Sequence, residues 1–413
     1  MEDTLAKHRP LEKGSVSRRR GRERVGESEP RYLSLMEFSG GERMNVVRGQ
    51  SPELPRRSPE LPRRPCIGPA VWRGRDLSAS PAWAVHLSPA RLDELDAALR
   101  TVRARGTPLL KVTADHFPLP TLAGELRSAA GELENGRGFV LVRGIPVERY
   151  SQEEAAVLLW GVGQHLGIPV SQDATGHMLG HLRDGPDART PLSPRTEAAD
   201  ALALLCLRAA GSRGRTTLAS SAAVHNAVLA RRPELLDGLS RTHFLDRRGE
   251  QLPGGLPWQA VPLAHRDGER LSLRYDRGRL ESAQRYPEVP RLSSAERELF
   301  DLMDETASSP ELRLDIDLAP GDLLLLNNHA VLHARTPPED EPDPEHRCHL
   351  LQLWLTPHRP RSLPPDFWGD EHSFTGGRGG VAPRDVITPH PPTKGQPHVR
   401  PLRTPGAIRP VPR

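Results

Sequence analysis

The sequence PGDLLLLNNHAVLHAR, which runs from Pro320 to Arg335, decides how this chain folds. Its first three residues are a turn signal, and the apolar run Leu323 to Leu326 is too short for a helix, so the pattern predicts a turn and then a buried strand. The polar residues after this run predict a loop, and the apolar run Leu350 to Leu355 predicts a returning strand. Because His329 and His333 lie between the two strands, we expect this region to form the wall of a functional site.

Composition limits how much of the chain is packed core. The 413 residues include 43 Pro and 36 Gly, and only 4% are aromatic. The net charge of +4 is uneven, because residues 1–75 carry +7 and residues 358–413 carry +5, which leaves −8 for the middle. A domain this acidic is not typical of nucleic-acid binders, whose affinity for phosphates comes from clustered Lys and Arg.

Cysteine and hydropathy patterns indicate the compartment. Cys66, Cys206 and Cys348 lie far apart, so the sequence predicts neither a disulfide framework nor a zinc site, and the cysteines fit a reducing compartment. There is no apolar run long enough for a membrane span, and no secretory signal pattern is present. We therefore expect a cytoplasmic protein without a membrane anchor.

The N-terminal 80 residues predict a disordered, basic, Pro-rich arm. They contain a perfect duplication, SPELPRR at Ser51 to Arg57 and again at Ser58 to Arg64. Two copies of a Pro-rich heptad do not build a repeat fold. The alternative is a docking peptide for a Pro-recognising partner. The tail, residues 358–413, is rich in Pro, Gly and Arg and is also expected to be disordered, which leaves 81–357 as the folded domain.

Helix signals are clear at three places. Ser88-Pro89 and the apolar spacing after it predict an amphipathic helix over 90–103. Ser151 with Glu154 forms a capping box for a helix through about Leu166, and Ser293 with Glu296 forms another for a helix through about Ala307.

Strand signals fill much of the rest. The sequence predicts strands at 138–144 and 312–318, and a hairpin-like pair at 198–208 and 216–223, followed by a helix over 223–230. His265-Arg266-Asp267 precedes a glycine and predicts a hairpin turn.

The segments Asn327 to Arg335 and Arg347 to Leu351, with the GFVLVRG strand and the GIPVSQ stretch, resemble the taurine dioxygenase and clavaminate synthase-like family. The resemblance covers roughly Leu109 to Pro357. It implies a mainly β domain with flanking helices, a double-stranded β-helix or jelly roll, and an oxidoreductase that uses iron(II) and 2-oxoglutarate to act on a small-molecule or amino-acid-derived substrate. It also implies that His333 is the distal iron ligand, and that Thr217 and Arg347 bind the 2-oxoglutarate carboxylate.

The resemblance breaks at the first two iron ligands. The family supplies them as His-x-Asp, and the matching position here reads Arg195-Thr196-Glu197. Arg stays protonated and offers no acceptor lone pair, so Arg195 is excluded as a ligand, and Glu197 with His333 gives only two protein ligands. One hypothesis is that Arg195 takes the metal's place as a fixed cation paired with Glu197. Another histidine could complete the set of three metal ligands. The candidates are His181, His225 and His329, and for each the alternative is a surface position or a contact with a ligand residue rather than with the metal.

Three interpretations of function stay open at this point. The first is an iron(II) and 2-oxoglutarate-dependent oxygenase, either active or with lost or reduced activity. The second is a metal-free pseudoenzyme that binds a ligand or a partner enzyme in the same pocket. The third is a non-redox enzyme in which Glu197 or His333 acts as a general base. Arg274 and Arg279 are further candidates for substrate contacts, with solvated strand positions as the alternative.

Overall fold

The computed structural model describes residues 61–80, 82–183, 193–209, 215–335, 347–368 and 378–384. The first heptad and residues 385–413, both assigned above to disordered ends, lie outside these ranges. Residues 61–79 lie inside the range assigned to the arm, yet Leu61, Cys66 and Trp72 are buried, and helix α1 (Gly74–Ser78) packs beside strand β11 (Leu314–Ile316). Apolar side chains spaced through this Pro-rich and Arg-rich segment bury it against the domain.

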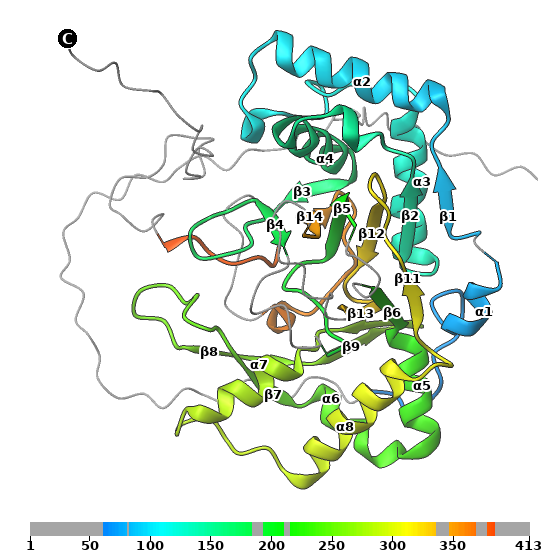
Figure 1. The fold of residues 1–413 in the computed structure, drawn as a ribbon. Coiled ribbons are helices and arrows are strands. Elements are labelled where there is room, and N and C mark those ends of the chain that lie inside the picture. Colours follow the sequence, from blue (N-terminus) through cyan, green and yellow to red (C-terminus); the bar gives the residue numbers. More distant parts are fainter. Residues whose placement is uncertain are drawn as a thin grey trace, which may run out of the picture. The chain divides into compact units, whose positions relative to one another are not determined.

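The largest sheet among the described residues has seven strands. Its order is β1-β2-β12-β5-β14-β3, with β4 also paired to β14 (Figure 1). The strands are β1 (Ala84–His86), β2 (Phe139–Arg143), β3 (Gly167–Pro169), β4 (Leu179–Arg183), β5 (Ala201–Arg208), β12 (Leu323–Asn327) and β14 (His349–Pro357). The apolar run Leu323 to Leu326 therefore forms a buried central strand between β2 and β5, as its length predicted.

A smaller three-stranded sheet, in the order β11-β6-β13, contains β6 (Thr216–Ser220) and β13 (Val331–Arg335). Leu202 and Leu324 of the large sheet share one hydrophobic cluster with Leu218 and Val331 of the small sheet. Because side chains alternate between the faces of a strand, this cluster defines the inner faces of the two sheets. His333 of β13 lies on the same face as Val331 and belongs to the site described below.

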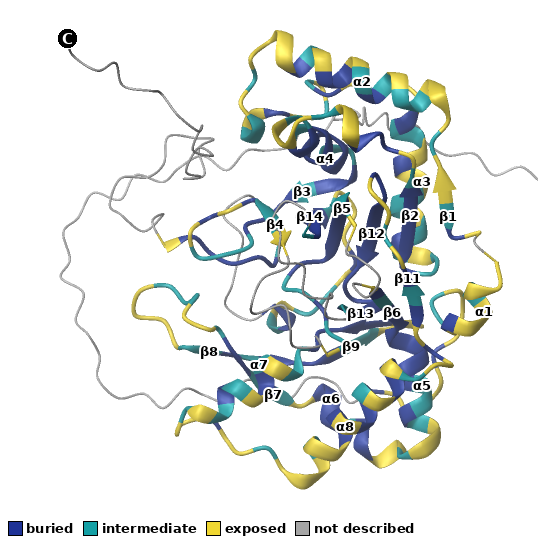
Figure 2. Ribbon diagram, in the orientation of Figure 1, coloured by how far each residue is buried: buried dark blue, intermediate teal, exposed yellow. Residues whose placement is uncertain are grey.

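Helices cover the outer faces of both sheets, and Figure 2 shows their exposed sides in yellow and the strands largely in dark blue. Helices α2 (Pro89–Ala104), α3 (Leu122–Asn135) and α4 (Gln152–Leu166) share a cluster with the large sheet, and α5 (Ser221–Arg231) and α8 (Ser294–Ser308) share another with the small sheet. Both predicted capping boxes are present, at Ser151 with Glu154 and at Ser293 with Glu296. Shorter elements complete the described chain: α6 (Asp237–Ser240), β7 (Thr242–Asp246), β8 (Trp258–Pro262), β9 (Ala264–Asp267), β10 (Arg270–Leu273) and α7 (Arg277–Ser282).

Two expectations about local structure were wrong. The predicted strands over 198–208 and 216–223 do not pair as a hairpin, because β5 lies in the large sheet and β6 in the small one. The polar segment after Asn327 is not all loop, because β13 forms within it and pairs with β6. The expected turn near Asp267 is present between β9 and β10. None of the helices in the described ranges has the length and apolar character that a membrane crossing requires.

Candidate functional site

The site begins with a short contact between two backbone segments. The amide N of Arg195 lies 2.9 Å from the carbonyl O of His333, and the amide N of His333 lies 2.9 Å from the carbonyl O of Arg195. This isolated antiparallel bridge fixes the segment Arg195-Thr196-Glu197 against β13. The chain therefore brings together the three residues that the sequence assigned to the metal position.

The three side chains form an ionic cluster around one carboxylate oxygen. Glu197 Oε1 accepts hydrogen bonds from Arg195 Nη2 at 3.0 Å and Nε at 3.2 Å, and it lies 3.3 Å from His333 Nε2. Burial alone would raise the pKa of Glu197, but the hydrogen bond with His333 and the charge of Arg195 outweigh burial and lower it to about 2. Glu197 is therefore ionised at neutral pH, and the pairing expected of Arg195 and Glu197 is present.

This donor set does not fit the family's iron. A 2-His-1-carboxylate site needs three protein ligands, and the described residues contain no group of three His, Cys, Asp or Glu side chains placed to hold a metal. A guanidinium about 4 Å from a dication would repel it by roughly 8 kcal/mol at an effective dielectric constant near 20. A fixed cation therefore lies beside the carboxylate that would have to bind the dication.

The ring of His333 gives a second reason. Metal-binding histidines generally donate their other ring N–H to an acceptor, which fixes the tautomer. His333 Nδ1 is buried and has no hydrogen-bond partner among the described residues. Among the described residues, no acceptor therefore holds the proton on Nδ1, which is the arrangement that would leave the Nε2 lone pair free for a metal.

The other histidines considered as replacements have partners elsewhere. His329 Nε2 lies 2.6 Å from Asp200 Oδ1, His181 Nδ1 lies 3.0 Å from His349 Nε2, and His225 Nδ1 lies 3.7 Å from Cys66 Sγ. In the part of the chain that the structure describes, none of them joins Glu197 and His333.

Thr217 is not on the face where a 2-oxoglutarate contact beside His333 would lie. In the β6–β13 ladder His333 is opposite Leu218, and Thr217 is opposite Ala334. Directly opposed residues of an antiparallel pair point to the same face, so the side chain of Thr217 points to the outer face and that of Thr216 to the inner one. Thr216, which is buried, is the threonine on the His333 side. The sequence did not reveal this one-residue offset.

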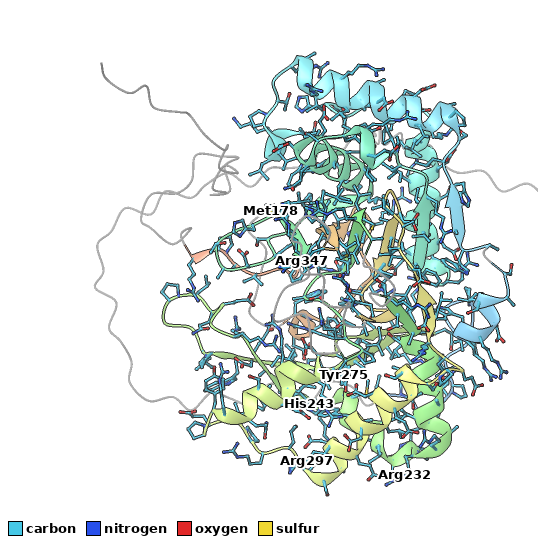
Figure 3. The ribbon with its side chains drawn as sticks, in the orientation of Figure 1. Met178, Arg232, His243, Tyr275, Arg297 and Arg347 are labelled. Carbon is cyan, nitrogen blue, oxygen red and sulfur yellow. The ribbon has the colours of Figure 1, made fainter. Side chains whose placement is uncertain are left out.

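Arg347 lies just before β14. Its carbonyl O accepts a hydrogen bond of 3.1 Å from Arg208 Nε, which attaches this residue to the end of β5. Figure 3 marks Arg347 near the middle of the view and Tyr275 below it, toward α7. Gln352, farther along β14, is buried and its side-chain amide N lies 3.2 Å from Gln172 Oε1.

A small cavity opens beside Glu197. Its volume is about 40 Å³, and charged side chains dominate its lining. The charged residues are Glu197, Asp246, Arg247, Glu250, Arg274, Asp276 and Arg279. Both arginines that the sequence offered as substrate contacts, Arg274 and Arg279, are among them. Of the acidic members, Glu197 was a candidate from the sequence. Asp246, Glu250 and Asp276 were not assigned a site role, because they come from the end of β7, from a turn and from the N-cap of α7.

Acidic neighbours hold Arg279 in place at this cavity. Its Nη2 lies 3.2 Å from Glu250 Oε2, and its Nε lies 3.7 Å from Asp276 Oδ2. Burial tends to lower the pKa of Arg279, but the charges of Glu250 and Asp276 raise it above its ordinary value. The cavity wall therefore presents fixed charges of both signs beside Glu197.

Comparison with known proteins adds three findings. The model of the taurine catabolism dioxygenase TauD, TfdA family matches residues 105–354. The chain is 28% identical over 331 residues to FR-33289 synthase of Streptomyces rubellomurinus, which covers 74% of this chain and 96% of that protein. It is 27% identical over 307 residues to a taurine hydroxylase-like protein of Stachybotrys chartarum, which covers 68% of this chain and 77% of that one.

Solved structures show the same fold. Asparagine oxygenase in complex with Fe(II), 3-hydroxyasparagine and succinate aligns with a TM-score of 0.54 at 18% identity, covering 66% of this chain and 93% of that one. The non-heme iron oxygenase OrfP in complex with Fe and alpha-ketoglutaric acid aligns with a TM-score of 0.51 at 19% identity, covering 66% and 94%.

Proposed function

The chain belongs to the TauD, TfdA family of iron(II) and 2-oxoglutarate-dependent oxygenases, and from that premise we propose that it binds a small amino-acid-derived molecule beside Glu197 without holding the family's iron. The observation that carries this proposal is the pair of hydrogen bonds from Arg195 to Glu197. They pair a guanidinium with the carboxylate that would have to bind iron, which supports a site without metal. The proposed metal-free protein keeps the pocket and loses the redox centre.

We infer that the scaffold is a jelly roll. The two sheets face each other across a shared hydrophobic cluster, and helices cover both outer faces. The likeness to asparagine oxygenase, at a TM-score of 0.54, supports the inference.

The charges of the cavity support an amino-acid-derived ligand. A molecule with an ammonium and a carboxylate group finds acidic partners in Glu197 and Asp276 and basic ones in Arg247 and Arg279. The solved relatives hold amino-acid derivatives, 3-hydroxyasparagine in one and dihydroxyarginine in another. Since about 40 Å³ is far below the roughly 300–1,000 Å³ of typical ligand pockets, the lining side chains must separate to admit an amino acid.

Calorimetric titration in the presence of a chelator tests the proposal. We expect at least one free amino acid, or a close derivative, to bind the purified chain without metal. Glu197→Gln and Asp276→Asn should each weaken binding about tenfold, by removing a charged hydrogen-bond partner. Asp317→Asn, on an exposed pair with Arg215, is the matched control and should leave affinity unchanged. Binding that appears only after iron(II) is added would contradict the proposal.

A second candidate is an active oxygenase, and one observation favours it. Glu197 Oε1 and His333 Nε2 are only 3.3 Å apart, so a single metal ion would lie within reach of both atoms. In this interpretation Glu197 and His333 would hold iron(II), which would supply oxygen activation, and Arg347 would bind 2-oxoglutarate. It requires Arg195 to leave Glu197. Oxygen-dependent formation of succinate from 2-oxoglutarate by the wild-type chain would favour this candidate over the first.

A further inference from the structure

The last four residues of the second copy of the duplicated heptad bind to a set of side chains on the folded domain. The residues Leu61-Pro62-Arg63-Arg64 close that copy and lie against the domain near α5 (Figure 1). Leu61 is only 4% exposed and belongs to the hydrophobic cluster of α5 and α8. This contact does not involve the cavity beside Glu197.

Two acidic side chains bind the arginines of the heptad. Arg63 Nη2 lies 2.5 Å from Asp237 Oδ2 and its Nε lies 3.3 Å from Asp237 Oδ1, which is a two-pronged contact. Arg64 Nη2 lies 2.9 Å from Glu269 Oε1. The site thus binds one leucine and two arginine side chains at the spacing found in the heptad.

The site also binds the backbone of the arm. Arg266, whose side chain is 1% exposed, donates from Nη1 to the carbonyl O of Arg64 at 2.7 Å and from Nη2 to that of Pro65 at 3.1 Å. Asn226 Oδ1 accepts from the amide N of Cys66 at 2.7 Å, and Asn226 Nδ2 donates to the carbonyl O of Cys66 at 2.9 Å. The contacts with Arg266 depend only on carbonyl groups, which any peptide offers.

The first heptad offers the same three side chains, as Leu54, Arg56 and Arg57. The two copies differ in the next two residues, because Ser58 and Pro59 stand at the places of Pro65 and Cys66. Proline has no N–H, so Pro59 lacks the donor that Cys66 gives to Asn226. This difference favours the second heptad and leaves the first as a weaker ligand for the same site.

We propose that the two heptads of one chain compete for this single site, so that the first heptad occupies it whenever the second is released. The exchange shifts the arm by seven residues and moves Cys66 out of its buried position. The duplication then gives the arm two alternative registers of attachment.

Peptide binding to full-length variants tests this proposal. A fluorescent synthetic SPELPRR peptide is titrated against the wild type, Leu54→Asp, Leu61→Asp and the double variant, with polarisation as the readout. We expect weak or no binding to the wild type and to either single variant, because one intact heptad still fills the site. The double variant has an empty site and should bind at least about tenfold more tightly.

Cys66 reports the register in the same proteins. We expect Leu61→Asp to make Cys66 reactive toward a thiol reagent while the peptide is still excluded. Cys206 and Cys348 are buried and serve as internal controls, since unfolding would expose all three. If the leucine variants unfold, Arg56→Glu and Arg63→Glu, alone and together, replace them, because they remove the contact with Asp237 without placing a charge in the core.

Three results would overturn the proposal. Peptide binding to Leu61→Asp as tight as to the double variant would mean that the first heptad does not fill the site. Failure of the double variant to bind would mean that the site does not recognise the heptad. Peptide binding to Leu61→Asp that appears only on dilution would assign the occupant to a second molecule.

Discussion

Two ionic clusters contain the same three kinds of side chain but differ in their surroundings. Their carboxylates, and likewise their histidines, lie close together in the sequence. Each has a carboxylate between an arginine and a histidine: Glu197 with Arg195 and His333, and Asp200 with Arg378 and His329. The side chains of Asp200 and His329 are 3% and 2% exposed, whereas those of Glu197 and His333 are 19% and 10% exposed beside a cavity. The same chemistry serves the core in one place and borders a pocket in the other.

This difference separates a structural role from a binding role. Asp200 attaches Arg378, and with it the described C-terminal residues 378–384, to the start of β5 through a 2.7 Å contact. Among the described residues, the side chain of Glu197 contacts Arg195 and His333, and it lines the cavity. Disrupting the first cluster should therefore lower stability, and disrupting the second should mainly change what the pocket binds.

The largest expected effect is on stability. Asp200→Ala should lower the free energy of unfolding by about 3–5 kcal/mol, because it leaves Arg378 and His329 without their buried partner. Glu197→Ala should cost only about 1–2 kcal/mol, since its partners are partly solvated. Urea unfolding of both variants at neutral pH measures the difference. Equal losses would break the proposed distinction between the clusters.

The second largest expected effect is on how the free energy of unfolding changes with pH. The pKa of Glu197 is about 2 in the folded chain, below its ordinary value of 4.5, so the unfolded state binds more protons between these values. Glu197 therefore contributes stability above pH 4.5 that is lost as the pH falls toward 2. Glu197→Gln should show a correspondingly weaker loss of stability between pH 5 and 2. Parallel acid-unfolding curves for the two proteins would show that the contribution is absent.

The smallest effect distinguishes the two histidines. His333→Gln should lower the free energy of unfolding by about 1 kcal/mol or less, because His333 makes one long side-chain contact and its Nδ1 has no described partner. His329→Gln should cost more, since it disturbs a buried 2.6 Å contact with Asp200. Thermal unfolding of both variants checks the order. The reverse order would mean that His333 is a core residue.

Local signals in the sequence predicted much of the fold. Both capping boxes, the apolar run of β12 and the helix after Pro89 depend on neighbouring residues, so they could be identified directly. The pairing of strands that are far apart in the sequence could not be identified in this way. The separation of β5 and β6 into different sheets depends on what each strand meets in space. Thr217 was assigned a site role from the family resemblance, and the strand register, which puts its side chain on the other face from His333, could not be read from the sequence.

The site shows the same division. The spacing of Arg195 and Glu197 was visible in the sequence, but their contact with His333 depends on a bridge between segments 138 residues apart. The other acidic residues of the cavity wall, Asp246, Glu250 and Asp276, come from separate elements and were not assigned a site role from the sequence.

The most direct test of the central claim is the iron(II) content of three proteins after anaerobic equilibrium dialysis: the wild type, Arg195→His and Arg195→Gln. If the guanidinium of Arg195 keeps the metal out, the wild type should retain almost no iron, Arg195→Gln should gain weak binding, and Arg195→His should hold close to one iron per chain. One iron per chain in the wild type, or no gain in Arg195→His, would contradict the claim.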